Sequence, residues 1–427
     1  MLHDLKPLRL IASDAPPRSA TGVWSGIAGL VAMIAAVIAL HSWQQPDYVR
    51  TLAVLAVVAL AMVVVDLQFY RVQLNASSGL SAAPLRPFDA GRAIRKLAGL
   101  WLTVGVVAAL YWLLPVYADP FYGPFKLAAL YALPALVLLS PVYIAFVDRL
   151  QHQPEDAYAE LGRLIAGERP RDWSMLVAHG RGWIIKGFFL PLMIVYTNND
   201  LAALWAGPPL VRIDDFEHFF SFGIGFLYLV DVLFAAVAYT LTLRLTDSHV
   251  RSAEPAVSGW LVCLFCYPPF WNSVGVKYLT FDQDGVYWGQ LLAPYPLLYG
   301  LWGSIILALV LVYVWATISF GLRFSNLTNR GIITNGPYRW VKHPAYLCKN
   351  ISWWMISVPF LSTAGWTVAV QSCLLLAGVN AVYWLRALTE ERHLAADPAY
   401  REYQDFIARR GLWAWIRRGL PWVKWAA

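Results

Sequence analysis

The stretch GPYRWVKHPAYL, Gly336 to Leu347, places a histidine, an arginine, a lysine and two tyrosines among two prolines. Pro344 disfavours a helical conformation for His343, so we expect a new helix to begin at Pro344. The first turn of a helix has free N–H groups and the positive end of its dipole, which suit a carboxylate or phosphate. Four basic side chains add positive charge there: Arg339, Lys342, His343 and Lys349. The stretch therefore predicts a site for a small ligand with an anionic group.

A second polar stretch, Tyr383 to Arg410, follows the last apolar run of the chain. Tyr383, Arg386 and Glu390 are three and four residues apart, so a helix places them on one face. Glu390 and Glu391 form a pair of carboxylates, and carboxylates accept hydrogen bonds from a ribose diol or an amino group. This stretch predicts an acidic surface beside aromatic rings.

Asp397 and Pro398 predict the start of a further helix, on which Tyr400, Tyr403 and Ile407 share a face. Aromatic rings stack on purines and attract cations such as a sulfonium. The last two predicted spans form a helical hairpin between the two polar stretches, which brings the stretches together. A nucleoside that carries a carboxylate, an amine and a sulfonium would match both sides of such a site.

The elements that position these stretches are membrane helices. The 427-residue chain is 59% hydrophobic and 14% charged, with a mean hydropathy of +0.52, whereas soluble domains are about 45–50% apolar and about 25% charged. We predict an all-α fold, a polytopic bundle of about ten transmembrane helices with a cofactor pocket at the cytoplasmic face of the C-terminal helices. The expected spans are 23–42, 51–69, 97–117, 125–146, 183–198, 219–243, 256–276, 297–320, 351–363 and 366–386.

Two of these spans are expected to be irregular. The ninth is short, and the two prolines of CYPPFWNS, Cys266 to Ser273, should break the seventh. Lys and Arg concentrate in alternate connections, with five in 70–96, five in 147–182 and five in 321–350. By the positive-inside rule, both termini and segment 321–350 face the cytoplasm. These basic residues form no patch interleaved with aromatic residues, so we expect no nucleic-acid partner.

NGPYRWVKHPAYL, followed by EERHL and spaced tyrosines, resembles the isoprenylcysteine carboxyl methyltransferase family and its phospholipid methyltransferase relatives over about Ser325 to Arg410. The resemblance implies a membrane enzyme that transfers a methyl group from S-adenosylmethionine to a lipid or lipidated acceptor in the cytoplasmic leaflet. The acceptor group is a carboxylate, a phosphate or an amine. The cofactor-binding residues expected by this resemblance are Tyr338, Arg339, His343, Pro344, Tyr346, Leu347, Glu390, Glu391, Tyr400 and Tyr403. Arg409, Arg410 or Lys349 is expected to hold the acceptor.

The chain departs from the family in two places. Leu347, Cys348 and Lys349 stand where the family usually has a glycine, and the first 245 residues match nothing in its small core. We therefore predict two regions. Residues 1–245 form a region of about six spans with a possible groove for a lipid substrate, and residues 246–427 form the methyltransferase-like region. Segment 154–178 is either an amphipathic helix at the groove entrance or a connector that covers the bundle.

Two other functions are compatible with parts of the sequence. An NADPH-dependent reductase similar to the sterol reductases is one, although those enzymes tend to have Asn where this chain has Pro344. A transporter or channel is the other, since Asp66 and Asp231 fall inside predicted spans, although Asp66 is also near enough to a helix end to reach water. Cys263 and Cys266 form a CxxC pair without a second ligand pair, so we expect no metal site.

Overall fold

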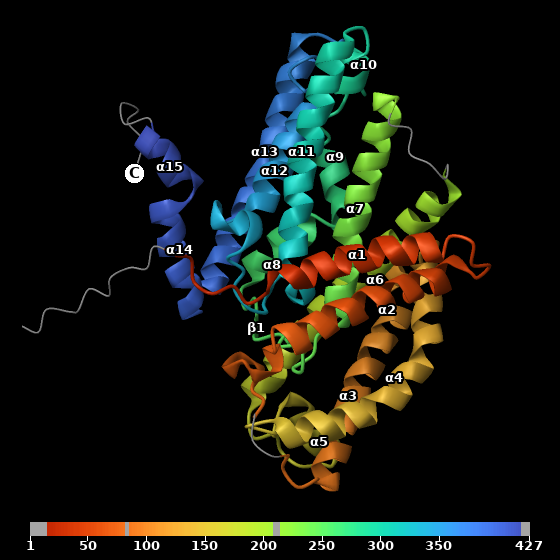
Figure 1. Cartoon of the computed structure of the whole chain (residues 1–427), viewed down its shortest axis with the longest axis vertical. Helices are drawn as coiled ribbons and strands as arrows, with labels where there is room; N and C mark the ends of the chain where they lie inside the picture. The colour runs from red at the N-terminus through yellow and green to blue at the C-terminus, as the bar shows by residue number, and fades with distance from the viewer. Residues whose placement is uncertain (1–14, 82–84, 208–213, 420–427) are drawn as a thin grey trace, which may run out of the picture.

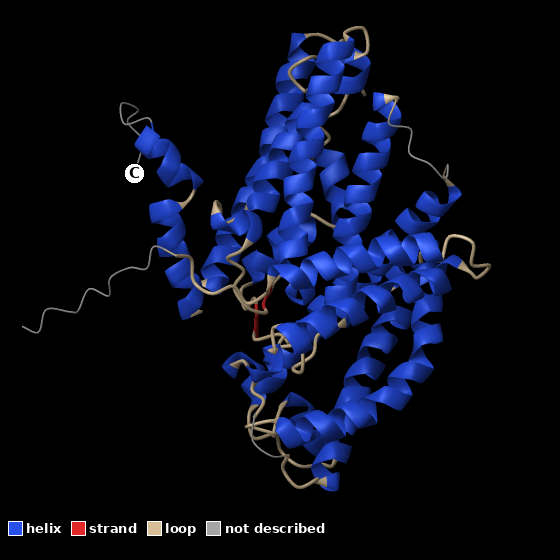
Figure 2. Ribbon diagram, viewed as in Figure 1, coloured by secondary structure: helices blue, strands red, loops and turns tan. Residues whose placement is uncertain are grey.

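The computed structural model describes residues 15–81, 85–207 and 214–419 (Figure 1). The structure is 74% helical, and Figure 2 shows helices throughout with one pair of very short strands. Six helical segments of the described residues are long and apolar enough to cross a membrane: Asp47–Phe69, Ala90–Leu113, Pro120–Leu150, Phe216–Thr240, Pro296–Arg323 and Trp366–Leu394. The structure thus fits the predicted all-α membrane bundle.

The α-helices within the described ranges are α1 (Val23–Ala39), α2 (Asp47–Val64), α3 (Ala90–Leu113), α4 (Gly123–Leu150), α5 (Ala157–Ile165), α6 (Trp173–Ala206), α7 (Phe216–Thr240), α8 (Val257–Phe265), α9 (Val276–Tyr278), α10 (Trp288–Leu292), α11 (Pro296–Phe320), α12 (Pro344–Ser357), α13 (Trp366–Leu394), α14 (Pro398–Arg410) and α15 (Leu412–Gly419). Short π and 3-10 turns include η1 (Val65–Phe69), η6 (Trp271–Gly275), η7 (Gly321–Arg323) and η8 (Gly336–Arg339). The strands are β1 (Ser252–Ala253) and β2 (Thr328–Asn329).

The predicted count of about ten spans is not confirmed. The first predicted span corresponds to α1, which has 17 residues. The ninth overlaps α12, which has 14 residues and ends at Ser357. The seventh is interrupted as expected, because α8 ends at Phe265 and η6 begins only at Trp271. The fifth, 183–198, is the middle of the 34-residue α6. Hydropathy located these apolar runs but not the helix ends.

Helix starts follow local sequence signals. Aspartate side chains accept hydrogen bonds from backbone N–H groups at the start of five helices, which stabilises otherwise unpaired donors. These caps are Asp89 for α3, Asp156 for α5, Asp172 for α6, Asp215 for α7 and Asp397 for α14. The starts of α12 at Pro344 and α14 at Pro398 agree with the sequence predictions.

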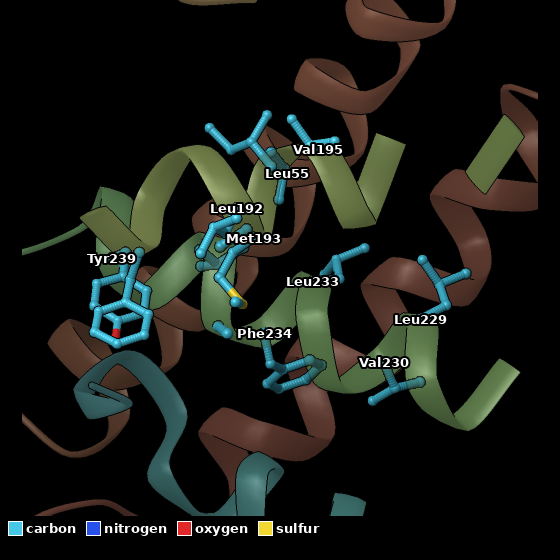
Figure 3. Packing of buried hydrophobic residues seen from close by; sticks show 14 of the residues in the cluster. Leu55, Leu192, Met193, Val195, Leu229, Val230, Leu233, Phe234 and Tyr239 are labelled. Carbon is cyan, nitrogen blue, oxygen red and sulfur yellow. The ribbon is translucent and has the colours of Figure 1, made fainter. Parts of the chain in front are cut away.

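The largest core lies where α2, α6 and α7 meet. Figure 3 shows side chains of these helices packed together, with Leu55 from α2, Leu192 from α6 and Phe234 from α7 among them. Leu192 and Phe234 are fully buried. The same cluster extends to α11 through Ile306 and Val310. The N-terminal helices therefore pack directly on α11, the first helix of the C-terminal half that follows α10.

A buried group of charges joins α2 to the end of α11. The Nη1 atom of Arg323 lies 3.7 Å from Oδ2 of Asp66, and its Nη2 lies 3.6 Å from Oδ2 of Asp247. Asp66 is 0% exposed, so the expectation that its carboxylate could reach water is wrong. The nearby Arg323 guanidinium provides the opposite charge that a buried carboxylate requires. Asp66 therefore has a structural partner, which weakens its reading as a transport residue.

Segment 154–178 contains α5, whose backbone lies against α3. A Cβ atom added at Gly162 would lie 2.2 Å from the carbonyl oxygen of Arg95, and one added at Gly99 would lie 2.1 Å from that of Tyr158. Glycine at both positions therefore allows the two helices to approach closely. Leu164 remains exposed. The helix in this segment is shorter than the predicted 154–178, because α5 ends at Ile165 and α6 begins at Trp173, and one face of α5 covers α3.

Candidate functional site

The loop before α12 is fixed by its packing on α11. Gly336 has a φ of +56°, and a Cβ atom there would lie 2.2 Å from Oγ of Ser319, so a side chain at this position would clash and be strained. Pro337 and Tyr338 are buried in the following turn η8. The chain then reaches His343 in a non-helical conformation, with φ −128° and ψ 63°, before α12 begins. The loop thus presents Lys342 and His343 at the helix start.

Glu391 of α13 is held by that loop. Its Oε1 lies 3.0 Å from Nε2 of His343, and its Oε2 forms an ion pair with the ammonium of Lys342. Gln404 of α14 donates a third, longer hydrogen bond to Oε2 at 3.4 Å. Both oxygens of Glu391 are therefore engaged by protein groups.

Glu390, its neighbour, has different partners. The hydroxyl of Tyr346 donates a hydrogen bond to Oε2 of Glu390 at 2.8 Å. The Tyr346 ring also stacks on His343, with 5.3 Å between ring centroids and an interplanar angle of 3°. The two adjacent carboxylates are thus placed by one stacked pair of rings, and only Glu391 is ion-paired with lysine.

A small pocket of about 30 Å³ lies beside Glu390. This volume is far below that of typical small-molecule sites, roughly 300–1,000 Å³, so a small-molecule ligand can bind here only when the lining side chains move apart. The pocket is formed between α13, α8 and the chain around β2. Its lining residues are Glu254, Gly259, Cys263, Asn326, Leu327, Thr328, Tyr346, Arg386, Thr389, Glu390, His393 and Leu394.

The far wall of the pocket comes from a distant part of the sequence. Antiparallel pairing of β1 with β2 places Ser252 opposite Asn329, and Glu254 follows directly after β1. A Cβ atom added at Gly259 would lie 2.6 Å from Cγ of Glu254, so glycine there leaves room for this carboxylate. The His393 Nδ1 atom lies 4.0 Å from Oε2 of Glu254. The pocket is therefore lined by two carboxylates, Glu254 and Glu390.

Arg386 is the cation of the pocket. It is 6% exposed, and its guanidinium lies 5.1 Å from the centre of the Tyr346 ring. The same group donates a hydrogen bond to Oδ1 of Asn326. A buried guanidinium between an amide and aromatic rings can hold an anionic ligand group while the two carboxylates hold donors.

Residues 299–396 match the model of the isoprenylcysteine carboxyl methyltransferase (ICMT) family. The match includes α12, α13 and the loop between α11 and α12. No curated protein and no solved structure matches the chain. The family match confirms the resemblance seen in the sequence and indicates a membrane methyltransferase.

The ICMT-matching region is packed against α14. The hydroxyl of Tyr403 donates to the carbonyl oxygens of Tyr338 and Val341, at 2.8 and 3.3 Å. Tyr403 and Tyr400 are both buried, and burial raises the pKa of each, with Glu391 nearby as a second cause. Among the described residues, the Tyr400 hydroxyl is buried without a hydrogen-bond partner. Tyr403 and Tyr338 thus act as supports of the loop.

The remaining predicted site residues lie apart from the pocket lining. Arg339 and Arg409 are exposed, and Arg409 donates to the carbonyl oxygen of Asp405 in its own helix. Arg410 is exposed at the end of the same helix. Pro344 is buried and Leu347 is half-buried on α12, and Lys349 points into a group of aromatic rings described below.

Of the twelve residues that line the pocket, only Tyr346 and Glu390 were predicted site residues. The ten others include four with charged, amide or imidazole side chains: Glu254, Asn326, Arg386 and His393. The sequence could have indicated Arg386 as a site residue, because it shares a helix face with Tyr383 and Glu390. His393 is three residues after Glu390, which also places it on that face. Glu254 and Asn326 reach the pocket only through the pairing of β1 with β2, which no local pattern predicts.

Proposed function

We propose that the chain is an integral membrane methyltransferase that uses S-adenosylmethionine and acts on a lipid or lipidated acceptor at the cytoplasmic leaflet. The observation that carries the proposal is the position of Glu390: it lines the pocket, is oriented by Tyr346, and lies within the segment that matches the methyltransferase family. The family match supplies the reaction class, and the pocket supplies the ligand chemistry.

The side chains present fit this cofactor. Glu390 and Glu254 can accept hydrogen bonds from a ribose diol and an amine, and Arg386 can pair with a carboxylate. The unpartnered, buried hydroxyl of Tyr400 is a further donor near the carboxylate pair. The cofactor, when bound, supplies an electrophilic methyl group on a sulfonium.

The task of the protein is then alignment and exclusion of water. Holding two reactants in line can lower a barrier by roughly 7–11 kcal/mol in favourable cases. Glu390 and Arg386 fix one reactant at the pocket. Lys349, Arg409 or Arg410 holds the polar group of the acceptor, which stays anchored in the lipid.

The pocket charges argue against the NADPH-dependent alternative. NADPH carries several phosphate charges, and two carboxylates line this pocket with one arginine. Like charges at close range destabilise binding. S-adenosylmethionine has a cationic sulfonium and an amine, which the carboxylates favour.

We further propose that residues 1–245 wall a groove for the acceptor, with α5 near its cytoplasmic entrance. The exposed apolar side chains of Leu164 and Ile165 on α5 support this role, because a lipid chain entering from the bilayer would contact them. The alternation of basic connections supports cytoplasmic termini.

Cofactor binding tests the proposal. Purified protein in detergent should bind S-adenosylmethionine, and NADPH should neither bind nor compete at the same concentration. A preference for NADPH would favour the reductase. Solute flux in proteoliposomes without either cofactor would favour a transporter.

A further inference from the structure

A group of polar side chains lies deeper in the bundle than the pocket. The carboxylate of Asp231 on α7 accepts hydrogen bonds from the hydroxyls of Tyr313 and Thr317 on α11. Lys349 of α12 contributes an ammonium group to the same region. We name these four residues the Asp231 cluster. With a rise of about 1.5 Å per residue, Lys349 lies roughly 8 Å below the start of α12, and Asp231 lies roughly 14 Å from the end of α7.

The Lys349 ammonium is surrounded by aromatic rings. Its Nζ lies 5.3 Å from the centre of the Tyr313 ring, 5.5 Å from that of Trp353 and 5.9 Å from that of Tyr383. Within the described part of the chain it has neither a hydrogen bond nor an ion pair. The carboxylate of Asp231 is the opposite charge that acts on it, at more than contact distance. This ammonium can therefore accept an anionic partner.

The Asp231 cluster is connected to the pocket through a single ring. Tyr383 has the Lys349 ammonium 5.9 Å from its centre and the Arg386 guanidinium also 5.9 Å away. Arg386 lines the pocket. The two cations therefore sit around one tyrosine, Arg386 at the pocket and Lys349 toward the interior of the bundle.

A charged side chain inside a membrane bundle is costly unless it is paired or has a function. Asp231 lies on α7, outside the region that matches the methyltransferase family, yet its two hydroxyl partners and Lys349 lie within it. The Tyr313 ring contacts both charges, since its hydroxyl binds Asp231 and its face lies toward Lys349.

We infer that Asp231 is a positioning residue for the acceptor: it orients Tyr313, whose ring lies against the Lys349 ammonium, and so aims this ammonium at the polar group of the lipid. This inference rests on the proposed function and extends it, because it gives α7 of the N-terminal region a role in acceptor binding. Lys349 contacts the acceptor, and Asp231 acts through Lys349 and Tyr313.

The test compares methyl-transfer kinetics of Asp231→Asn with those of Asp200→Asn, a half-buried carboxylate of α6 outside the cluster. Asp231→Asn should raise the KM for the acceptor about tenfold or more, with affinity for S-adenosylmethionine unchanged within about twofold. Asp200→Asn should leave both values at the wild-type level. A Tyr313→Phe variant, which keeps the carboxylate, should raise the acceptor KM by a smaller factor and covers the case in which Asp231→Asn does not fold.

Coupling to Lys349 separates positioning from a structural role. Lys349→Met should raise the acceptor KM, whereas Lys349→Arg should keep the KM close to the wild-type value. Adding Asp231→Asn to Lys349→Met should cause little further change in KM. The inference would be overturned if the KM increases caused by Asp231→Asn and Lys349→Met multiplied in the double variant. It would also be overturned if Asp231→Asn and Tyr313→Phe both left the acceptor KM unchanged. In either case the methyltransferase proposal would stand. A wild-type protein that transfers no methyl group would overturn both.

Discussion

Changing each of the two neighbouring glutamates of α13 to glutamine should affect a different property of the protein. Glu390 lines the pocket, accepts a hydrogen bond from the Tyr346 hydroxyl, and has Nδ1 of His343 4.0 Å from its Oε2. Glu391 is absent from the pocket lining and is held by Lys342 and His343. We therefore expect Glu390→Gln to weaken cofactor binding and Glu391→Gln to weaken the anchoring of the loop.

The magnitudes follow from these contacts. A hydrogen bond to a charged group contributes about 1.5–3 kcal/mol, so loss of one such bond between Glu390 and the cofactor should weaken affinity roughly 10- to 150-fold. The ion pair of Glu391 is partly screened, because the Lys342 side chain is 33% exposed and that of Glu391 is 19% exposed. Loss of this pair together with the His343 contact should cost about 2 kcal/mol, or roughly 2–4 °C in apparent melting temperature.

The assay is titration of purified protein with S-adenosylmethionine, paired with thermal unfolding of the same samples. Glu402→Gln, a change of an exposed carboxylate on α14, is the matched control and should alter neither measurement. If Glu390→Gln binds the cofactor as tightly as the control does, the assignment of the pocket is refuted. Equal loss of cofactor affinity in both glutamine variants would show that Glu390 and Glu391 do not have these separate roles in binding and loop anchoring.

Burial lowers the pKa of His249 to about 3, so the unfolded chain binds this proton below about pH 6.5 while the folded protein does not. The stability that depends on neutral His249 is complete above pH 6.5 and declines as the pH falls toward 3. His249→Gln should therefore make the free energy of unfolding depend less on pH between 6.5 and 3. An unchanged pH dependence in this variant would contradict the burial argument. A topology reporter after Ser325 should read cytoplasmic and one after Asp282 external, and the reverse result would separate the site from cytoplasmic cofactor. Changing Leu161 and Leu164 of α5 together to aspartate should raise the KM for the lipid with unchanged cofactor affinity; unaltered transfer in a folded double variant would exclude α5 as the entrance.

Local signals in the sequence predicted the helix starts around the site. Pro344 and Asp397 act on the backbone beside them, so the starts of α12 and α14 were correctly expected. The shared face of Tyr400 and Tyr403 also followed from helical spacing, and both side chains are buried. Such features depend only on residues within one or two turns.

The division between Glu390 and Glu391 needed tertiary structure. Both are adjacent on α13, and the rotation of that helix relative to α8 and α12 decides which carboxylate enters the pocket. Glu254 is 136 residues from Glu390 in sequence and reaches the same pocket through β1 and Gly259. Hydrophobic periodicity contains no information on such long-range pairing. The short ninth span was expected from its short apolar run, but its end at Ser357 was not.

The most direct test of the central claim is methyl transfer itself. Purified protein is incubated with S-adenosylmethionine labelled in the methyl group and with total membrane lipid, and the labelled products are identified by mass. We expect label in a lipid or lipidated product, strongly reduced in Glu390→Gln and retained in Glu402→Gln. Absence of label from every lipid product, in protein that is folded and supplied with cofactor, would contradict the account.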